Sequence, residues 1–101
     1  MQQEIFGPVA PVTTYSSEEE VLEVINASKL GLASYVYSRD LGKAIRLAER
    51  IDAGMVGLNR GIVSDPSAPF GGTKQSGIGR EGARDGTRAF QETQYLSVGW
   101  D

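Results

Sequence analysis

The chain reads Pro69-Phe70-Gly71-Gly72-Thr73-Lys74-Gln75-Ser76-Gly77-Ile78-Gly79-Arg80-Glu81 between two segments of more ordinary composition. Each glycine inside a helix or strand costs about 0.5–1 kcal/mol relative to alanine, because glycine loses more backbone freedom on folding. Such a run is favourable only where backbone must turn tightly or approach another group closely. It therefore predicts an ordered, functional loop with Phe70 as its apolar anchor.

The second half of this loop matches a nucleotide-binding pattern in spacing alone. The segment Gly77-Ile78-Gly79-Arg80-Glu81-Gly82 has the form G-x-G-x-x-G, which binds dinucleotide phosphates when it directly follows a buried strand. The residues before Gly77 are glycines and polar side chains, which cannot form such a strand. We therefore expect no nucleotide to bind at 77–82, and an independent nucleotide-binding domain is the disfavoured alternative.

Three segments on the N-terminal side of the loop have strand patterns. The first, 9–15, is rich in valine and threonine; the second, 32–38, carries Tyr35 and Tyr37 on one face; the third, 55–59, is short and apolar. Helix patterns separate them. Strands and helices that alternate at this spacing predict an α/β fold with right-handed βαβαβ units in a parallel sheet.

The two helix patterns begin at clear capping residues. Ser17 is followed three positions later by Glu20, which is the spacing of a capping box, and Asp40 caps the second helix. Gly31 and Gly54 are the expected stops. The apolar stripes predicted to face the core are Val21, Val24, Ile25 and Ser28, with Leu22 beside them, and Leu41, Ala44, Ile45, Ala48 and Ile51.

Two elements are predicted after the loop. A helix is expected over 83–93, with Ala89 and Phe90 facing inward, and a last strand is expected over 95–100. No strand pattern follows that segment. Its partner could be a strand of the same chain or a strand of another chain, and the sequence leaves both open.

Composition excludes several classes of function. The chain of 101 residues is 40% hydrophobic, so it can build a core, and its net charge of −3 offers no basic surface for nucleic acid or anionic lipid. It has no cysteine and no histidine. Disulfides, a thiol nucleophile, a Ser-His-Asp triad and the usual zinc sites are therefore absent, and no metal site is expected. The lack of an apolar run or leader favours a cytoplasmic protein without membrane contact.

Three motifs in order resemble the aldehyde dehydrogenase superfamily. They are Glu4-Ile5-Phe6-Gly7-Pro8, Gly54-Met55-Val56-Gly57-Leu58-Asn59, and the loop that begins at Pro69. The tracts 61–64 and 74–77 look most like the succinate-semialdehyde dehydrogenase branch. The resemblance implies a C-terminal part of a longer NAD(P)-dependent enzyme. The family's cysteine nucleophile and glutamate base lie upstream of the matched region, so no catalytic residue is expected in this chain.

The resemblance also implies roles for four residues. Glu4 corresponds to a glutamate that binds the nicotinamide ribose, and Phe6 to a phenylalanine beside the nicotinamide ring. Ser64 matches a serine that helps to hold the distal carboxylate of the substrate, and Phe70 an aromatic wall of the aldehyde tunnel. The loop glycines are expected to be structural, and Arg80 and Glu81 are expected to fasten the loop by ion pairing.

The resemblance further implies a domain division and partners. Residues 1–93 would belong to the catalytic domain, and residues 94–101 would form a strand of the oligomerisation type. The implied partners are the remainder of the enzyme chain and further copies of it. NAD or NADP would bind the complete enzyme but not tightly to this chain alone. The alternative is a non-catalytic module that associates through exposed sheet edges.

Overall fold

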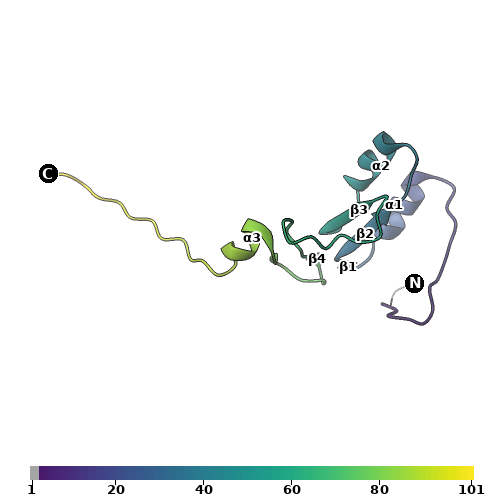
Figure 1. Ribbon diagram of the computed structural model, residues 1–101, viewed down its shortest axis with the longest axis horizontal. Helices are drawn as coiled ribbons and strands as arrows, with labels where there is room; N and C mark the ends of the chain where they lie inside the picture. The colour runs from purple at the N-terminus through teal and green to yellow at the C-terminus, as the bar shows by residue number, and fades with distance from the viewer. Residues whose placement is uncertain (1–2) are drawn as a thin grey trace.

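The computed structural model describes residues 3–101 as a small α/β body with a long arm at each end (Figure 1). The helices and strands follow one another as α1 Glu18–Asn26, β1 Leu30–Gly31, β2 Ala33–Val36, α2 Leu41–Ala48, β3 Met55–Leu58, β4 Thr73–Lys74 and α3 Ala83–Arg88. Within this part of the chain, no helix has the length and apolar character needed to cross a bilayer.

Strands β2 and β3 form the parallel pair that the sequence predicts. Ala33 lies opposite Met55 and Val36 opposite Leu58, and α2 connects the two strands, so residues 33–58 are one βαβ unit. The core lies where this pair meets α1 and α2 and is made by Leu22, Val36, Ala44 and Ile51. Parallel strands are covered by their crossover helices, which explains why the buried residues lie in this unit or, like Leu22 of α1, against it.

Helix α1 begins as predicted but presents a different face to the core. The Ser17 hydroxyl accepts the Glu20 amide at 3.2 Å, and the Glu20 carboxylate accepts the Ser16 amide at 2.8 Å, one residue earlier than in a standard capping box. Leu22 is 4% exposed whereas Val24 is 67% exposed, so the predicted stripe is partly wrong. The helix ends at Asn26, before the expected stop at Gly31.

Helix α2 is capped as predicted, because an Asp40 carboxylate oxygen accepts the Lys43 amide at 2.9 Å. Ala44 and Ile51 are buried, as expected, while Leu41 and Ile45 are exposed. The helix ends at Ala48, and a turn continues to Ile51. The chain then enters β3 through Gly54, which is therefore not the helix stop.

The first predicted strand is wrong. Residues 9–15 form an extended arm with no strand, and Val9, Val12 and Tyr15 are exposed. A strand is stabilised by its hydrogen-bonded neighbour, and no described segment lies alongside this one in a ladder. The body consequently contains one βαβ unit instead of two. Its second sheet is antiparallel and very short, with Leu30 opposite Lys74 and Gly31 opposite Thr73.

The C-terminal predictions are also partly wrong. Helix α3 ends at Arg88 instead of Thr93, and Phe90 is 93% exposed instead of inward-facing. Residues 95–100 are extended and exposed and form no strand, and the arm points away from the body in Figure 1. The Cα radius of gyration is 18.3 Å. A compact chain of this length would have about 13 Å, so the arms account for the difference.

Candidate functional site

The glycine-rich stretch is an ordered loop closed at its base. The Phe70 amide donates to the Glu81 carbonyl at 2.8 Å, and the Glu81 amide donates to the Phe70 carbonyl at 2.7 Å. The Arg80 guanidinium donates to the carbonyls of Gly72 at 2.8 Å and Gly79 at 2.7 Å. The prediction of an ordered loop is therefore confirmed.

The predicted means of fastening is wrong, however. Among the described residues, no ion pair involves Arg80 or Glu81. Arg80 holds the loop through backbone carbonyls because its donors lie beside the turn that the glycines form, and Glu81 takes part through its backbone.

The glycines of the loop are structural, as expected. A Cβ atom on Gly71 would lie 2.5 Å from the Gly79 carbonyl oxygen, so two stretches of backbone approach too closely for any side chain. Gly79 itself has a φ of 88°, which residues with a side chain rarely adopt. The strand before Gly77 is the two-residue antiparallel β4, which differs from the buried parallel strand of a dinucleotide-binding loop.

Residues 73–76 of the loop are hydrogen-bonded to the segment that follows α1. The Ser76 hydroxyl accepts the Gly31 amide at 2.9 Å, and the Gln75 amide donates to the Lys29 carbonyl at 3.0 Å. Thr73 adds a longer bond from its hydroxyl to the Gly31 carbonyl at 3.4 Å. Residues 73–76 are thus joined to 29–31 by backbone and side chains together.

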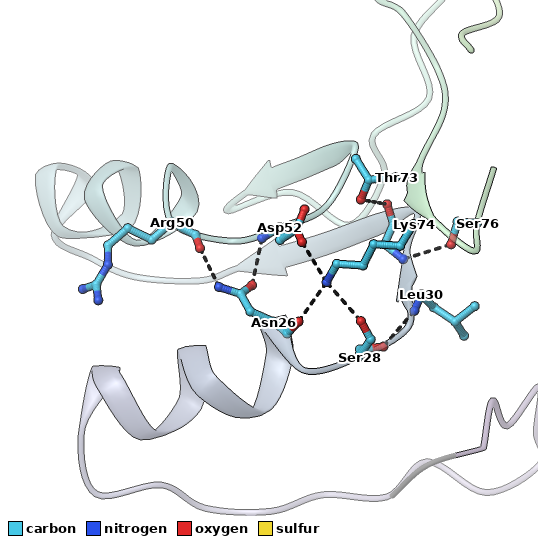
Figure 2. Close-up of polar contacts among 9 residues, drawn as sticks. Asn26, Ser28, Leu30, Arg50, Asp52, Thr73, Lys74 and Ser76 are labelled. Carbon is cyan, nitrogen blue, oxygen red and sulfur yellow. Dashed lines mark hydrogen bonds and ion pairs between the residues drawn. The ribbon is translucent and has the colours of Figure 1, made fainter. Parts of the chain in front are cut away.

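Lys74 extends this attachment, and Figure 2 shows its side chain reaching across to three acceptors. Its Nζ donates to the carbonyls of Asn26 and Ser28 at 3.0 Å each and pairs with an Asp52 carboxylate oxygen at 3.0 Å. The Asn26 side-chain amide in turn donates to the Arg50 carbonyl and accepts from the Asp52 backbone amide, both at 2.8 Å. Sequence reasoning missed Lys74, because its carbonyl acceptors lie 46 and 48 positions away and leave no local pattern.

The segment between β3 and the glycine-rich loop carries Ser64 and is also held in place. Asn59, in the left-handed region with φ 53°, begins it. The Asn59 side-chain amide accepts from the Ser38 amide and donates to the Ser38 carbonyl, both at 2.8 Å, so it joins the two chain segments just beyond the ends of β2 and β3. At the other end, the Ala83 amide donates to the Pro66 carbonyl at 3.3 Å.

A tight turn follows Ser64. The Asp65 carboxylate accepts the Ser67 hydroxyl at 2.6 Å and the Ser67 amide at 2.9 Å. These bonds to the charged form, with a smaller contribution from the positive charge of Arg60, lower the pKa of the Asp65 carboxyl from its ordinary value of 3.8. The turn stays charged at neutral pH and orients the backbone on either side of it.

The structure places the four predicted site residues in two separate parts of the chain. Ser64 is exposed and Phe70 is half-buried, and the Asp65 turn lies between them. Glu4 and Phe6 lie on the N-terminal arm, where Phe6 is 97% exposed. No hydrogen bond or ion pair among residues 3–101 joins the two pairs, so the structure alone does not assemble them into one site.

A hollow of about 600 Å³ opens beside Phe70. Its walls come from the glycine-rich loop, from Leu32 and from residues in the segment 82–90, which contains α3; they include Phe70, Ile78, Arg80 and Phe90. Aromatic and apolar walls with few polar groups suit a small organic molecule or a packed protein segment. In the described part of the chain, no three acidic side chains gather closely enough to share a metal ion.

Comparison with known proteins identifies the family of this chain. The sequence profile described as the aldehyde dehydrogenase family matches residues 1–96. The chain belongs to the aldehyde dehydrogenase family. It is 55% identical over 96 residues to succinate-semialdehyde dehydrogenase from Paenarthrobacter nicotinovorans, covering 95% of this chain and 21% of that protein. It is 50% identical over 97 residues to 3-sulfolactaldehyde dehydrogenase from Pseudomonas putida, covering 96% and 20%.

A solved structure supports the fold of this aldehyde dehydrogenase chain, including its arms. The succinic semialdehyde dehydrogenase from Streptococcus pyogenes, in complex with NADP⁺, superposes with a TM-score of 0.87 at 42% identity, over 95% of this chain and 21% of that one. Only about a twentieth of the chain lies outside the superposition, so most of each extended arm falls inside it. The chain spans about a fifth of the length of these relatives.

Proposed function

We propose that this chain is the C-terminal part of an NAD(P)-dependent aldehyde dehydrogenase that oxidises succinate semialdehyde to succinate. The observation that carries the proposal is the 55% identity with a succinate-semialdehyde dehydrogenase over 95% of the chain, which spans Ser64 and the ordered loop. The second relative supports a common substrate class. Its aldehyde carries a sulfonate, and succinate semialdehyde carries a carboxylate, so both end in an anion.

The substrate half of the proposed site consists of Ser64 and Phe70. The Ser64 hydroxyl is exposed on a segment held by Asn59 and by the Asp65 turn, so it is available to donate to a carboxylate. Phe70 stands where the loop closes and lines the adjoining hollow. In the proposed site, an apolar wall suits the short carbon chain of the aldehyde, and a hydroxyl donor suits its distal anion.

The cofactor half consists of Glu4 and Phe6. The carboxylate of Glu4 has no ion pair among the described residues, and one carboxylate can accept from two neighbouring hydroxyls, as ribose binding requires. Phe6 exposes nearly its whole ring, which can limit where a planar group lies. When bound, the nicotinamide cofactor supplies the hydride acceptor for aldehyde oxidation.

The chain does not supply the nucleophile. It contains no cysteine and no histidine, so a thiol that attacks the aldehyde has to come from another part of the enzyme. We therefore expect the isolated chain to reduce neither NAD⁺ nor NADP⁺ in the presence of succinate semialdehyde.

A chimeric enzyme tests the proposal. In this enzyme, residues 3–96 replace the matched segment of the Paenarthrobacter nicotinovorans succinate-semialdehyde dehydrogenase. We expect the chimera to oxidise succinate semialdehyde with NAD⁺ or NADP⁺, and the isolated chain to be inactive. A folded chimera without activity, or a pure isolated chain with activity, would overturn the proposed function.

The alternative is a module that associates without catalysis. One observation favours it: the C-terminal arm exposes Tyr95, Leu96, Val98 and Trp100. Residues 94–101 would then act as an association strand, as they would also in the complete enzyme. The activity of the chimera distinguishes the two proposals, because a module that only associates would not restore aldehyde oxidation.

A further inference from the structure

The ammonium group of Lys74 is saturated by partners from two other parts of the fold. Two of its three donors meet the carbonyls at the C-terminal end of α1, and the third meets Asp52 in the turn before β3 (Figure 2). The Lys74 side chain is only 20% exposed, so these bonds are partly shielded from water. Its backbone is also constrained, because its φ is 56°.

The same region fixes the backbone next to Phe70. A side chain on Gly54 would collide with the Gly71 carbonyl oxygen, so Gly71 lies directly against the start of β3. Asp52, the ion-pair partner of Lys74, is two residues before Gly54. Lys74 therefore draws the loop onto the segment that Gly71 touches, and Phe70 is the residue directly before Gly71 in the sequence.

We infer that Lys74 is a positioning residue of the substrate site, whose ammonium group holds Phe70 in place by fastening the loop to α1 and to the turn before β3. The inference deepens the proposed function, since it takes Phe70 as a wall of the aldehyde tunnel. Lys74 contacts no substrate in this scheme and acts only through the loop.

The variant Lys74→Gly tests the effect of the ammonium group separately from the effect of the backbone conformation. Most other residues at position 74 would be strained at a φ of 56°, as lysine is, whereas glycine adopts this φ freely. The loop of the glycine variant is therefore expected to fold without the lysine side chain. The matched control is Lys43→Met, which removes another lysine ion pair, that with Glu18 at 2.7 Å, on the surface of the body. An exposed pair of this kind contributes little to stability.

Kinetics in the chimeric enzyme distinguish positioning from general stability. A smaller folded fraction lowers the apparent kcat and leaves KM unchanged, whereas a misplaced tunnel wall weakens binding and raises KM. For Lys74→Gly we expect KM for succinate semialdehyde to rise about tenfold, which corresponds to about 1.4 kcal/mol, with kcat and cofactor affinity within about twofold. Lys43→Met is expected to match the parent.

A measurement on the 101-residue chain is independent of catalysis. In NMR spectra, we expect the proton contacts between Gly54 and Gly71 to disappear in Lys74→Gly, while contacts within the βαβ unit remain. Unchanged Gly54–Gly71 contacts, or an unchanged KM in an active chimera, would overturn the role of Lys74. An inactive parent chimera would overturn the proposed function instead, and the NMR result would then decide whether Lys74 holds the loop.

Discussion

At the scale of single residues, polar side chains do most of the positioning around the candidate site. Arg80, Lys74 and Asn59 all bind backbone carbonyls or amides instead of lying free in solvent. Hydrogen bonds of this type satisfy loop backbone that has no sheet or helix partner. Of the residues that would contact substrate and cofactor, Glu4, Phe6 and Ser64 are exposed and Phe70 is half-buried. The contribution of the three exposed residues is therefore measured on ligand binding and not on folding.

Ser64→Ala in the chimeric enzyme is expected to weaken the apparent affinity for succinate semialdehyde by roughly ten- to a hundredfold. A hydrogen bond to a charged group contributes about 1.5–3 kcal/mol, and each 1.4 kcal/mol is tenfold in affinity. Steady-state kinetics measure the effect. Butanal, which lacks the carboxylate, serves as the control and should be little affected. Equal losses on both aldehydes would exclude carboxylate recognition by Ser64.

The Asp65 carboxyl is expected to titrate below 3.8, because the charged form accepts two bonds from Ser67. A lowered pKa means that this turn is stabilised above about pH 3.8 and loses that contribution as pH falls through the lower, folded value. Ser67→Ala should move the midpoint up toward 3.8, and Ser64→Ala should leave it unchanged. Carboxyl ¹³C NMR titration measures the midpoints; no difference between the two variants would contradict the assignment.

At the scale of elements, the βαβ unit and the loop behave differently. The βαβ unit and α1 form a core from apolar residues, and both helices, α1 and α2, begin at capping residues. The segments that build this core follow one another directly in the sequence. The loop has a bonded pair at its base and no core of its own, so its place depends on how tightly it lies against the unit. The two meet where Gly54 lies against Gly71 and where Lys74 pairs with Asp52.

Gly54→Ala is expected to destabilise the chain by roughly 1–3 kcal/mol, the usual cost of overpacking, because the new methyl group would collide with backbone at Gly71 and Gly72. Urea unfolding followed by circular dichroism gives the change in free energy. Gly99→Ala is the matched control, since no atom lies within 4 Å of a Cβ at that position. Equal stability of the two variants would show that the loop moves away without cost.

At the scale of the whole molecule, the arms give the chain an extent of 70 Å along its longest axis, against 31 Å and 25 Å along the others. Both arms expose large apolar side chains, among them Phe6, Val12, Leu96 and Trp100. The superposition on a much longer dehydrogenase includes most of both arms. The extended course of the arms is therefore shared with the corresponding segments of that dehydrogenase.

The isolated chain is expected to self-associate through the C-terminal arm. An unpaired, extended apolar segment is a template for pairing with another chain. Light scattering coupled to size exclusion should give a molar mass above that of one chain, rising with concentration. The double variant Leu96→Lys, Val98→Lys should shift the chain toward monomer, whereas Ser97→Lys, on the opposite face of the segment, should shift it less. A monomer at high concentration without any substitution would contradict this prediction.

The sequence by itself determined the features that depend on neighbouring residues. Ser17 and Asp40 cap their helices within three positions, Ala44 and Ile51 follow the helical period into the core, and the glycines mark the ordered loop. The parallel pairing of β2 and β3 also follows from their spacing. Family resemblance through three motifs is confirmed by the match over residues 1–96.

Only the tertiary structure decided what depends on distant partners. Lys74 and Asn59 find their acceptors far along the chain, and no local pattern marks them. The segments 9–15 and 95–100 have strand-like composition but no bonded neighbour among residues 3–101, so they form extended arms there. Composition sets which backbone shape a segment favours, whereas a strand exists only where a second segment satisfies its hydrogen bonds.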